Sequence, residues 1–239
     1  YTLGSADTDI TLRDFRFYIH DVRLVTDSGD EVAVTLTQNN WQNGDVAMLD
    51  FEDASGTCAG TAETNTTIQG TVPDDSKTFT GVRFTVGVPE NRNHLLNSEQ
   101  PSPMNATGMF WSWRGGYKFM RLDVAPVGGG TRPDASTFTA WNLHLGSTNC
   151  TETEPYTCSN INRPEIELDG FDPDTSTIQL DYASLVANSN LGWDGGGAAG
   201  CMSGTTDPEC PEVFTALGLN LASGEVDGTL MQTAFSVTP

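Results

Sequence analysis

The stretch "DFRFYIHDVRLVT" (residues 14–26) decides the fold of this 239-residue chain. Phe15, Phe17 and Ile19 alternate with a second series of residues that includes Tyr18. Successive side chains of a β-strand point to opposite faces, so this period of two predicts a strand. Much of both series is apolar or aromatic, so we expect both faces of the strand to be at least partly covered.

Seven further stretches resemble strands and are separated by turn clusters such as "DSGD" and "VGGGTRP". Short strands with regular breaks predict a β-sandwich or an open barrel. We expect the β-sandwich, immunoglobulin-like or of a related two-sheet type. It should form a single all-β domain over residues 1–239. Long disulfide-held loops and at most one or two short helices should complete it, with 210–219 as the best helix. The further strands are 31–38, 67–73, 78–89, 111–127, 138–148, 164–171 and 176–185.

The charge balance excludes two classes of partner. Lys and Arg number 11 against 32 Asp and Glu, giving a net charge of -21. Nucleic acid and anionic membrane surfaces would repel such a chain, and no apolar run is long enough to cross a bilayer. A soluble protein outside the cytoplasm is favoured. The sequence also has no GxSxG or HExxH motif, so we do not expect an enzyme.

The five cysteines favour the same location. Cys150 and Cys158 would close a short loop, as would Cys201 and Cys210, and disulfides form in oxidising compartments. These two pairs are the simplest arrangement, although the sequence permits others. Cys58 is then either a free thiol or a sign that the pairing differs.

Three histidines stand out in a chain with few basic side chains: His20, His94 and His144. Imidazole is a ligand for copper, zinc, nickel and iron. The alternative is that each ring only forms hydrogen bonds at the end of a strand. Asp21, next to His20, would either orient that imidazole or be a solvated strand residue.

An acidic turn gives a separate hypothesis. Asp169, Asp172 and Asp174 offer the oxygen ligands that Ca²⁺ prefers. Their spacing does not match an EF-hand, so an ordinary acidic turn is the alternative.

The stretch "MFWSWRGGYKF" (109–119) concentrates aromatic residues. Trp111 and Trp113 are two residues apart and would lie on one face of a strand. Taken alone, such a pair is more often core than a chemical site.

Six motifs together resemble the MbnP-like family, the WxW, four-Cys copper-binding partners of a di-haem MauG-like peroxidase. The resemblance spans about residues 15–219. The motifs, in chain order, are "FYIHDVRLV", "FTVGVPENRNH", "MFWSWRGGYKFMRLD", "WNLHLGSTNC", "NRPEIEL" and "GCMSGTTDPECPEVFTALGL".

The resemblance implies a periplasmic or cell-surface protein that binds copper, as Cu(I) or Cu(II), in copper acquisition or homeostasis. The related methanotroph proteins MopE and CorA bind copper through His and a Trp oxidised to kynurenine, and the di-haem partner is expected to perform that oxidation. The rival function is a structural or adhesive surface β-sandwich, Ca²⁺-stabilised or carbohydrate-binding. In that case the Trp pair is core or a stacking surface.

The family motifs carry over unevenly to individual residues. His20, His94 and His144 coincide with motif histidines, and we expect two of them to bind copper. Trp111 and Trp113 match WxW and are the leading candidates for oxidation. A third candidate is Trp141, which lies three residues before His144 and therefore on the opposite face of a regular strand.

Overall fold

The strand predicted at residues 14–26 runs through the middle of the main sheet. In the computed structural model, which describes residues 1–58, 60–112 and 114–239, it is β2 (Thr8–Thr26). Phe17, Tyr18 and Ile19 are all buried, so both faces of this strand are covered as expected.

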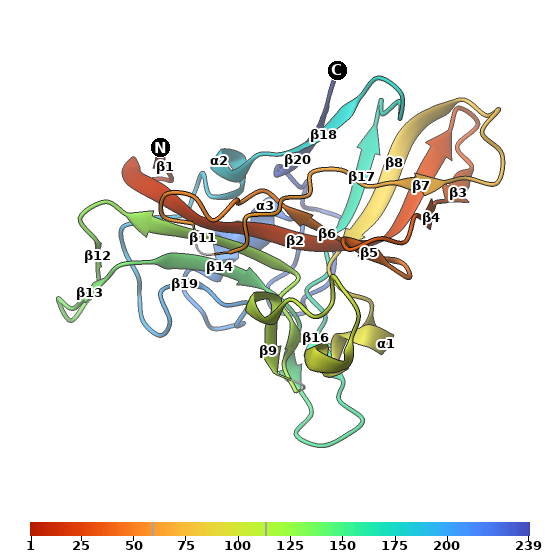
Figure 1. The fold of residues 1–239 in the computed structure, drawn as a ribbon. Coiled ribbons are helices and arrows are strands. Elements are labelled where there is room, and N and C mark those ends of the chain that lie inside the picture. The colour runs from red at the N-terminus through yellow and green to blue at the C-terminus, as the bar shows by residue number, and fades with distance from the viewer. Residues whose placement is uncertain (59, 113) are drawn as a thin grey trace.

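The main sheet has ten strands, and β2 pairs with five of them in antiparallel register (Figure 1). One parallel pair, β14 with β19, lies at an edge. The central order is β17 (Glu165–Asp169), β8 (Phe79–Val86), β2, β11 (Met120–Pro126), β14 (Trp141–Leu145) and β19 (Gly200–Cys201); the other members are β1 (Thr2–Leu3), β3 (Glu31–Ala33), β5 (Gln42–Asn43) and β6 (Val46–Asp50).

Short hairpins and helices surround this sheet. Three α-helices are present among the described residues: α1 (Glu90–Asn93), α2 (Tyr182–Leu185) and α3 (Cys210–Ala216). The two-stranded sheets are β4 (Thr35–Leu36) with β7 (Gly70–Thr71), β9 (Phe110–Ser112) with β10 (Gly116–Tyr117), β12 (Gly130–Thr131) with β13 (Thr137–Phe138), β15 (Thr148–Cys150) with β16 (Cys158–Asn160), and β18 (Thr177–Leu180) with β20 (Phe235–Thr238).

The apolar face of the main sheet packs against the β18–β20 pair and α2. The ring of Phe235 in β20 meets Phe17 and Phe84 edge-on at 6.0 and 5.5 Å between ring centroids. Tyr182 in α2 meets Phe15 in the same way at 6.1 Å. Edge-to-face aromatic pairs add stabilisation to the apolar area they bury. The contact joins two layers, so the predicted all-β, sandwich-like fold is confirmed.

Several local predictions differ from the structure. Residues 31–38 divide into β3 and β4, and residues 138–148 divide among β13, β14 and β15. The helices number three rather than one or two, although 210–219 does contain α3. Residues 111–127 do not form one strand, because the chain breaks into β9, β10 and β11. Gly116 has a φ of +75° and fits so closely against Asn93 that a Cβ would collide with it. The glycine permits this turn. The prediction that Trp111 and Trp113 share one strand face involves Trp113, which lies outside the described residues.

The predicted cysteine pairs are confirmed. Disulfides join Cys150 to Cys158 across the β15–β16 hairpin and Cys201 to Cys210 between β19 and α3. Cys58 is a free thiol. No helix in the described part of the chain is long and apolar enough to span a membrane.

A buried carboxyl in β6 makes the stability depend on pH. Asp50 is fully buried, and burial raises its pKa to about 7. Between about pH 4 and pH 7 the folded state therefore holds a proton that the unfolded state has released. The contribution of Asp50 to the free energy of unfolding is expected to fall as pH rises through this window and to level off above it.

We expect the Asp50→Asn substitution to flatten this part of the pH profile, because the amide does not titrate. Denaturant unfolding of both proteins at pH 5 and pH 8 measures the difference. If the free energy of unfolding of the variant falls as much between pH 5 and pH 8 as that of the parent, groups other than Asp50 cause the pH dependence.

Candidate metal site

His20 lies in β2 beside the loop that follows β8. Its Nδ1 is 2.9 Å from the carbonyl oxygen of Gly87. A carbonyl only accepts, so Nδ1 donates its proton and Nε2 keeps a lone pair. Burial lowers the pKa of His20, so the ring is neutral at pH 7. A neutral imidazole fixed through one nitrogen, with a lone pair on the other, is the form in which histidine binds a metal ion.

The carboxylate of Asp21 does not orient this ring. Asp21 is about half exposed and pairs with Arg23 at 3.2 Å, and its φ of +52° turns the backbone out of the regular strand. The backbone carbonyl of Gly87 performs the orienting role instead, which the sequence pattern did not reveal.

His94 caps the C-terminal end of α1. Its Nε2 lies 3.3 Å from Asn93 Nδ2 and 3.5 Å from Sγ of Cys158, and its side chain is only 11% exposed. Because the amide nitrogen of Asn93 only donates, Nε2 accepts in that contact. The ring tilts toward Tyr156 at 5.9 Å between centroids, and both residues line an open hollow of about 510 Å³. His94 is therefore nearly buried but borders a hollow open to solvent.

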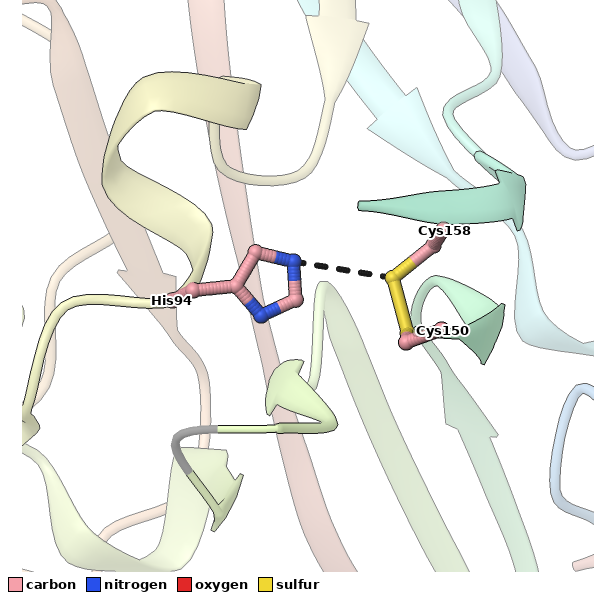
Figure 2. Close-up of side chains that lie close together, drawn as sticks. All are labelled: His94, Cys150 and Cys158. Atoms are coloured by element: carbon pink, nitrogen blue, oxygen red, sulfur yellow. Dashed lines mark hydrogen bonds between the residues drawn. A yellow bond between two sulfur atoms is a disulfide. The ribbon is translucent and has the colours of Figure 1, made fainter. Parts of the chain in front are cut away.

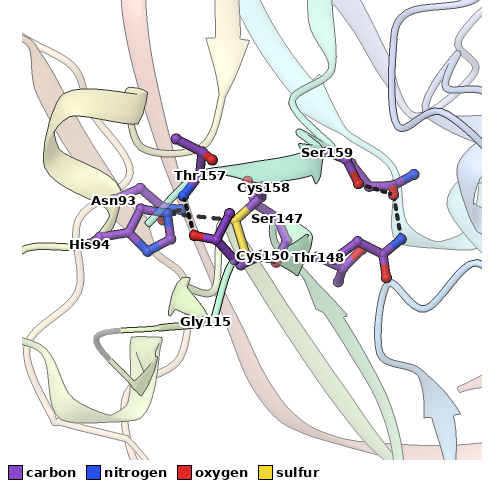
Figure 3. Close-up of a disulfide and its surroundings, with 12 residues drawn as sticks. Asn93, His94, Gly115, Ser147, Thr148, Cys150, Thr157, Cys158 and Ser159 are labelled. Atoms are coloured by element: carbon purple, nitrogen blue, oxygen red, sulfur yellow. Dashed lines mark hydrogen bonds between the residues drawn. A yellow bond between two sulfur atoms is a disulfide. The ribbon is translucent and has the colours of Figure 1, made fainter. Parts of the chain in front are cut away.

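His94 and the Cys150–Cys158 disulfide form a close group (Figure 2). One nitrogen of the ring and both sulfurs lie within 4.8 Å of one another. A disulfide sulfur carries no thiolate charge and is a poor metal ligand, so this trio is not a metal site in its oxidised form. Within residues 1–58, 60–112 and 114–239, no other three His, Cys, Asp or Glu side chains gather this closely. The disulfide positions β15 and β16 beside Asn93 and His94 (Figure 3).

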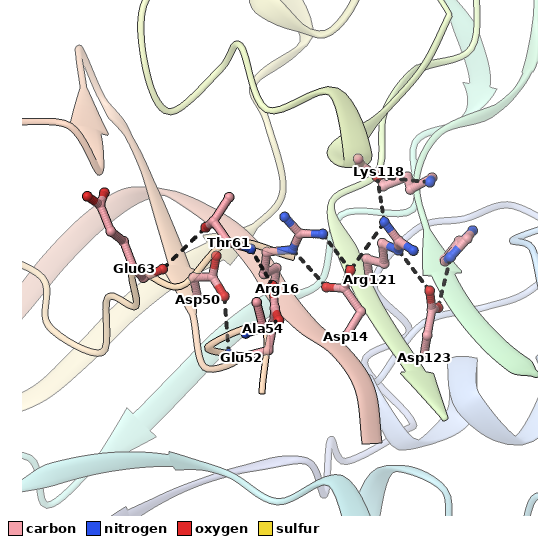
Figure 4. A network of polar contacts seen from close by, with 12 residues as sticks. Asp14, Arg16, Asp50, Glu52, Ala54, Thr61, Glu63, Lys118, Arg121 and Asp123 are labelled. Carbon is pink, nitrogen blue, oxygen red and sulfur yellow. Dashed lines mark hydrogen bonds and ion pairs between the residues drawn. The ribbon is translucent and has the colours of Figure 1, made fainter. Parts of the chain in front are cut away.

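His144 contacts a buried network of charges, in which Figure 4 labels Asp14, Arg16, Arg121 and Asp123. Its Nε2 is 2.9 Å from Asp123, which pairs with Arg121 at 2.8 Å. Burial alone would raise the pKa of Asp123, but its contacts with His144 and Arg121 lower it. Asp14 bridges the two arginines: its carboxylate lies 3.2 Å from Arg121 and 2.5 Å from Arg16. Nε2 of His144 is thus held by a carboxylate in an ion-pair network.

The sheet register separates His144 from His20. His144 is opposite Arg121, which is opposite Arg16. His20 lies four residues beyond Arg16, which corresponds to about 13 Å along the strand and about 10 Å across two strand spacings. The Cα atoms are then about 16 Å apart, which is beyond the reach of two imidazoles that share one ion.

His20 and His94 are instead linked through a common set of elements. Arg92 in α1 donates to the carbonyl oxygen of Asn43 in β5 at 2.7 Å. The next strand of that hairpin, β6, pairs with His20 through Val46. The carbonyl of Gly87 holds the ring of His20, and the chain runs directly from Gly87 to His94. Figure 1 shows α1, β9 and β16 together on one side of the sheet.

The hairpin that contains the WxW motif packs against this same segment. The backbone nitrogen of Tyr117 donates to Asn93 Oδ1 at 3.0 Å. The ring of Trp111 covers Gly146, where a Cβ would lie 2.5 Å from Cζ3 of the indole. Trp111 is partly buried, and the Tyr117 contact brings the strand paired with its own against the residue that precedes His94.

The other two tryptophan candidates differ in what the structure says of them. Trp141 is completely buried in the core, on the face of β14 opposite His144. Its Nε1 has no hydrogen-bond partner among the described residues. Trp113 lies outside the described residues.

The acids considered for Ca²⁺ form an exposed turn. Oδ1 of Asp172 accepts from the backbone of Asp174 at 2.9 Å, and Asp169 pairs with Arg83 at 3.0 Å. These contacts are those of an ordinary acidic turn.

Comparisons with known proteins agree with the motif resemblance. The family model MbnP matches residues 1–203. The solved structure of MbnP from Methylosinus trichosporium is 36% identical and covers 99% of this chain and 90% of that chain, with a TM-score of 0.89. Comparison with curated proteins gave no match. A family model over most of the chain and a closely superimposable relative show that the chain belongs to the MbnP family.

Proposed function

We propose that this protein binds copper in the periplasm or at the cell surface, in copper acquisition or homeostasis, and is not itself an enzyme. His20 and His94 are the proposed protein ligands. The observation that carries the proposal is the state of His20: a neutral imidazole held through Nδ1 by Gly87, with Nε2 left to bind. Membership of the MbnP family supports copper as the metal.

The donor chemistry fits copper. Two neutral imidazoles with a weak third ligand suit Cu(I) without a thiolate, and four of the five cysteines are held in disulfides. The acidic surface would also favour the approach of a cation.

We propose that a tryptophan of the WxW motif supplies the third ligand after oxidation by a partner di-haem peroxidase. The enzyme would use two equivalents of hydrogen peroxide, which give two oxygen atoms to the indole and leave as water. Conversion to kynurenine replaces the indole N–H, a donor that binds metals poorly, with an aniline amine and a ketone. Trp111 and Trp113 are favoured over Trp141, because a fully buried indole in the core is not accessible to a partner enzyme. The hollow beside His94 gives this region an open surface.

Intact-mass measurement and peptide mapping test the modification. Protein produced together with a di-haem peroxidase of this kind is expected to gain two oxygen atoms as N-formylkynurenine, or kynurenine after loss of the formyl group. The gain should map to the peptide that contains residues 109–119. A gain on Trp141, or no gain with an active partner present, would contradict the proposal.

Copper titration tests the binding itself. The oxidised protein should bind one Cu(I) in competition with a chromophoric chelator, and the protein produced without the partner should bind more weakly. Failure of both forms to bind copper would leave the structural or adhesive function as the better explanation.

A further inference from the structure

A second group of acids lies away from the histidines, around the glycine-rich loop between α2 and α3. Oδ2 of Asp194 accepts from Arg132 Nε at 2.5 Å, and Oε1 of Glu209 accepts from the backbone of Gly195 at 2.7 Å. Both oxygens of Asp207 accept backbone hydrogen bonds, from Met202 and from Glu209. Three carboxylates therefore brace the two ends of this loop.

Two oxygens in this group have no donor. Oδ1 of Asp194 and Oε2 of Glu209 are buried, and no N–H or hydroxyl group of the described residues donates to either. The two carboxyl groups lie within hydrogen-bonding reach of each other. The Asp194 side chain is fully buried and Glu209 is only 8% exposed. Buried carboxylate oxygens almost always have a partner, and two ionised carboxylates cannot satisfy each other. When both are ionised, this pair therefore needs a cation between its oxygens.

The charges point to the kind of ligand. Among the described residues, Arg132 is the one basic side chain that contacts these three carboxylates, so two negative charges are left uncompensated when all three are ionised. The carboxylates resist ionising together without a further positive charge.

We propose that Asp194 and Glu209 bind a hard divalent cation, Ca²⁺, through the two oxygens that lack donors. The donors are all oxygen, which suits Ca²⁺ rather than copper, and a divalent charge balances the cluster. Water and backbone carbonyls would complete the coordination, as they commonly do for this ion. The ion would fix the loop against α3 and the Cys201–Cys210 disulfide.

This site differs from the exposed turn at Asp172. There the carboxylate oxygen already accepts a backbone hydrogen bond, and the side chain is open to water. In the buried pair, the burial and the two unsatisfied oxygens are the features that a bound cation would explain.

Terbium luminescence gives a direct test, because Tb³⁺ replaces Ca²⁺ and is sensitised by a nearby indole. Trp193 packs against Gly195, whose backbone holds Glu209. Excitation of tryptophan in the full chain should produce Tb³⁺ emission that Ca²⁺ displaces, with a Kd of about 10⁻⁴–10⁻³ M or tighter. Binding should weaken below pH 7, where protons compete for Glu209.

Glu209→Gln and Asp194→Asn should each weaken Ca²⁺ binding at least tenfold, measured by calorimetry with circular dichroism as the check on folding. Glu209→Gln can keep the acceptor for the Gly195 nitrogen, so it serves if Asp194→Asn does not fold. Trp193→Phe should remove the Tb³⁺ emission and leave Ca²⁺ binding intact, and Asp172→Asn should change neither. The proposal is overturned if the parent shows no displaceable emission and no Ca²⁺ heat, or if folded Glu209→Gln binds like the parent.

Discussion

The His94→Ala protein is expected to lose copper binding, and His20→Ala should lose it equally. Removal of groups that merely orient a ligand costs about 10–100-fold in metal affinity, so removal of a ligand should cost at least about 100-fold. His20 presents a lone pair on a ring already fixed by Gly87, and His94 lies on the segment that begins there. Competition titration with Cu(I) on the oxidised proteins measures the loss.

His144→Ala is the matched control. Its imidazole is held by Asp123 in the ion-pair network and lies far from His20 along the sheet. The variant should bind copper like the parent and be less stable. If folded His144→Ala loses copper while His94→Ala retains it, the assignment of ligands is wrong.

The Asp14→Asn protein should lose about 3–5 kcal/mol of unfolding free energy, the cost of breaking a buried ion pair. Asp14 is fully buried between two guanidinium groups, at 2.5 Å from Arg16 and 3.2 Å from Arg121. The amide keeps the shape of the side chain but removes the negative charge that lies between the two guanidinium groups. Reversible denaturant unfolding measures the change.

Glu152→Gln makes the same chemical change at an exposed ion pair. Glu152 and Arg114 are 83% and 52% exposed, so this variant should lose less than about 1 kcal/mol. Equal losses in the two variants would mean that the buried network does not stabilise the fold through its charges.

The strand pattern and the cysteine pairs could be predicted because they depend on neighbours in sequence. Alternation in residues 14–26 reports directly on two covered faces, and short loop closures favour the Cys150–Cys158 and Cys201–Cys210 pairs. The break within 111–127 could not be predicted in the same way. It depends on how closely Gly116 approaches Asn93, a residue more than twenty positions earlier.

The candidate site was only partly predictable for a similar reason. The motifs gave His20, His94 and His144 as candidates, but the environments of the first two come from distant segments: Gly87 for one ring, Cys158 for the other. The network around His144 was missed because Asp14 and Arg16 alternate with Phe15 as exposed residues would on a half-buried strand. Only the strand order reveals that Arg121 and Asp123, on the neighbouring strand, lie opposite Arg16 and Asp14.

Isolation of the protein from its native cells tests the central claim most directly, with metal analysis and peptide mapping of the same sample. We predict about one copper per chain and a kynurenine or N-formylkynurenine within residues 109–119, at one of the two tryptophans of the WxW motif. Copper-free protein with every tryptophan unmodified, recovered from cells grown with copper, would contradict the account.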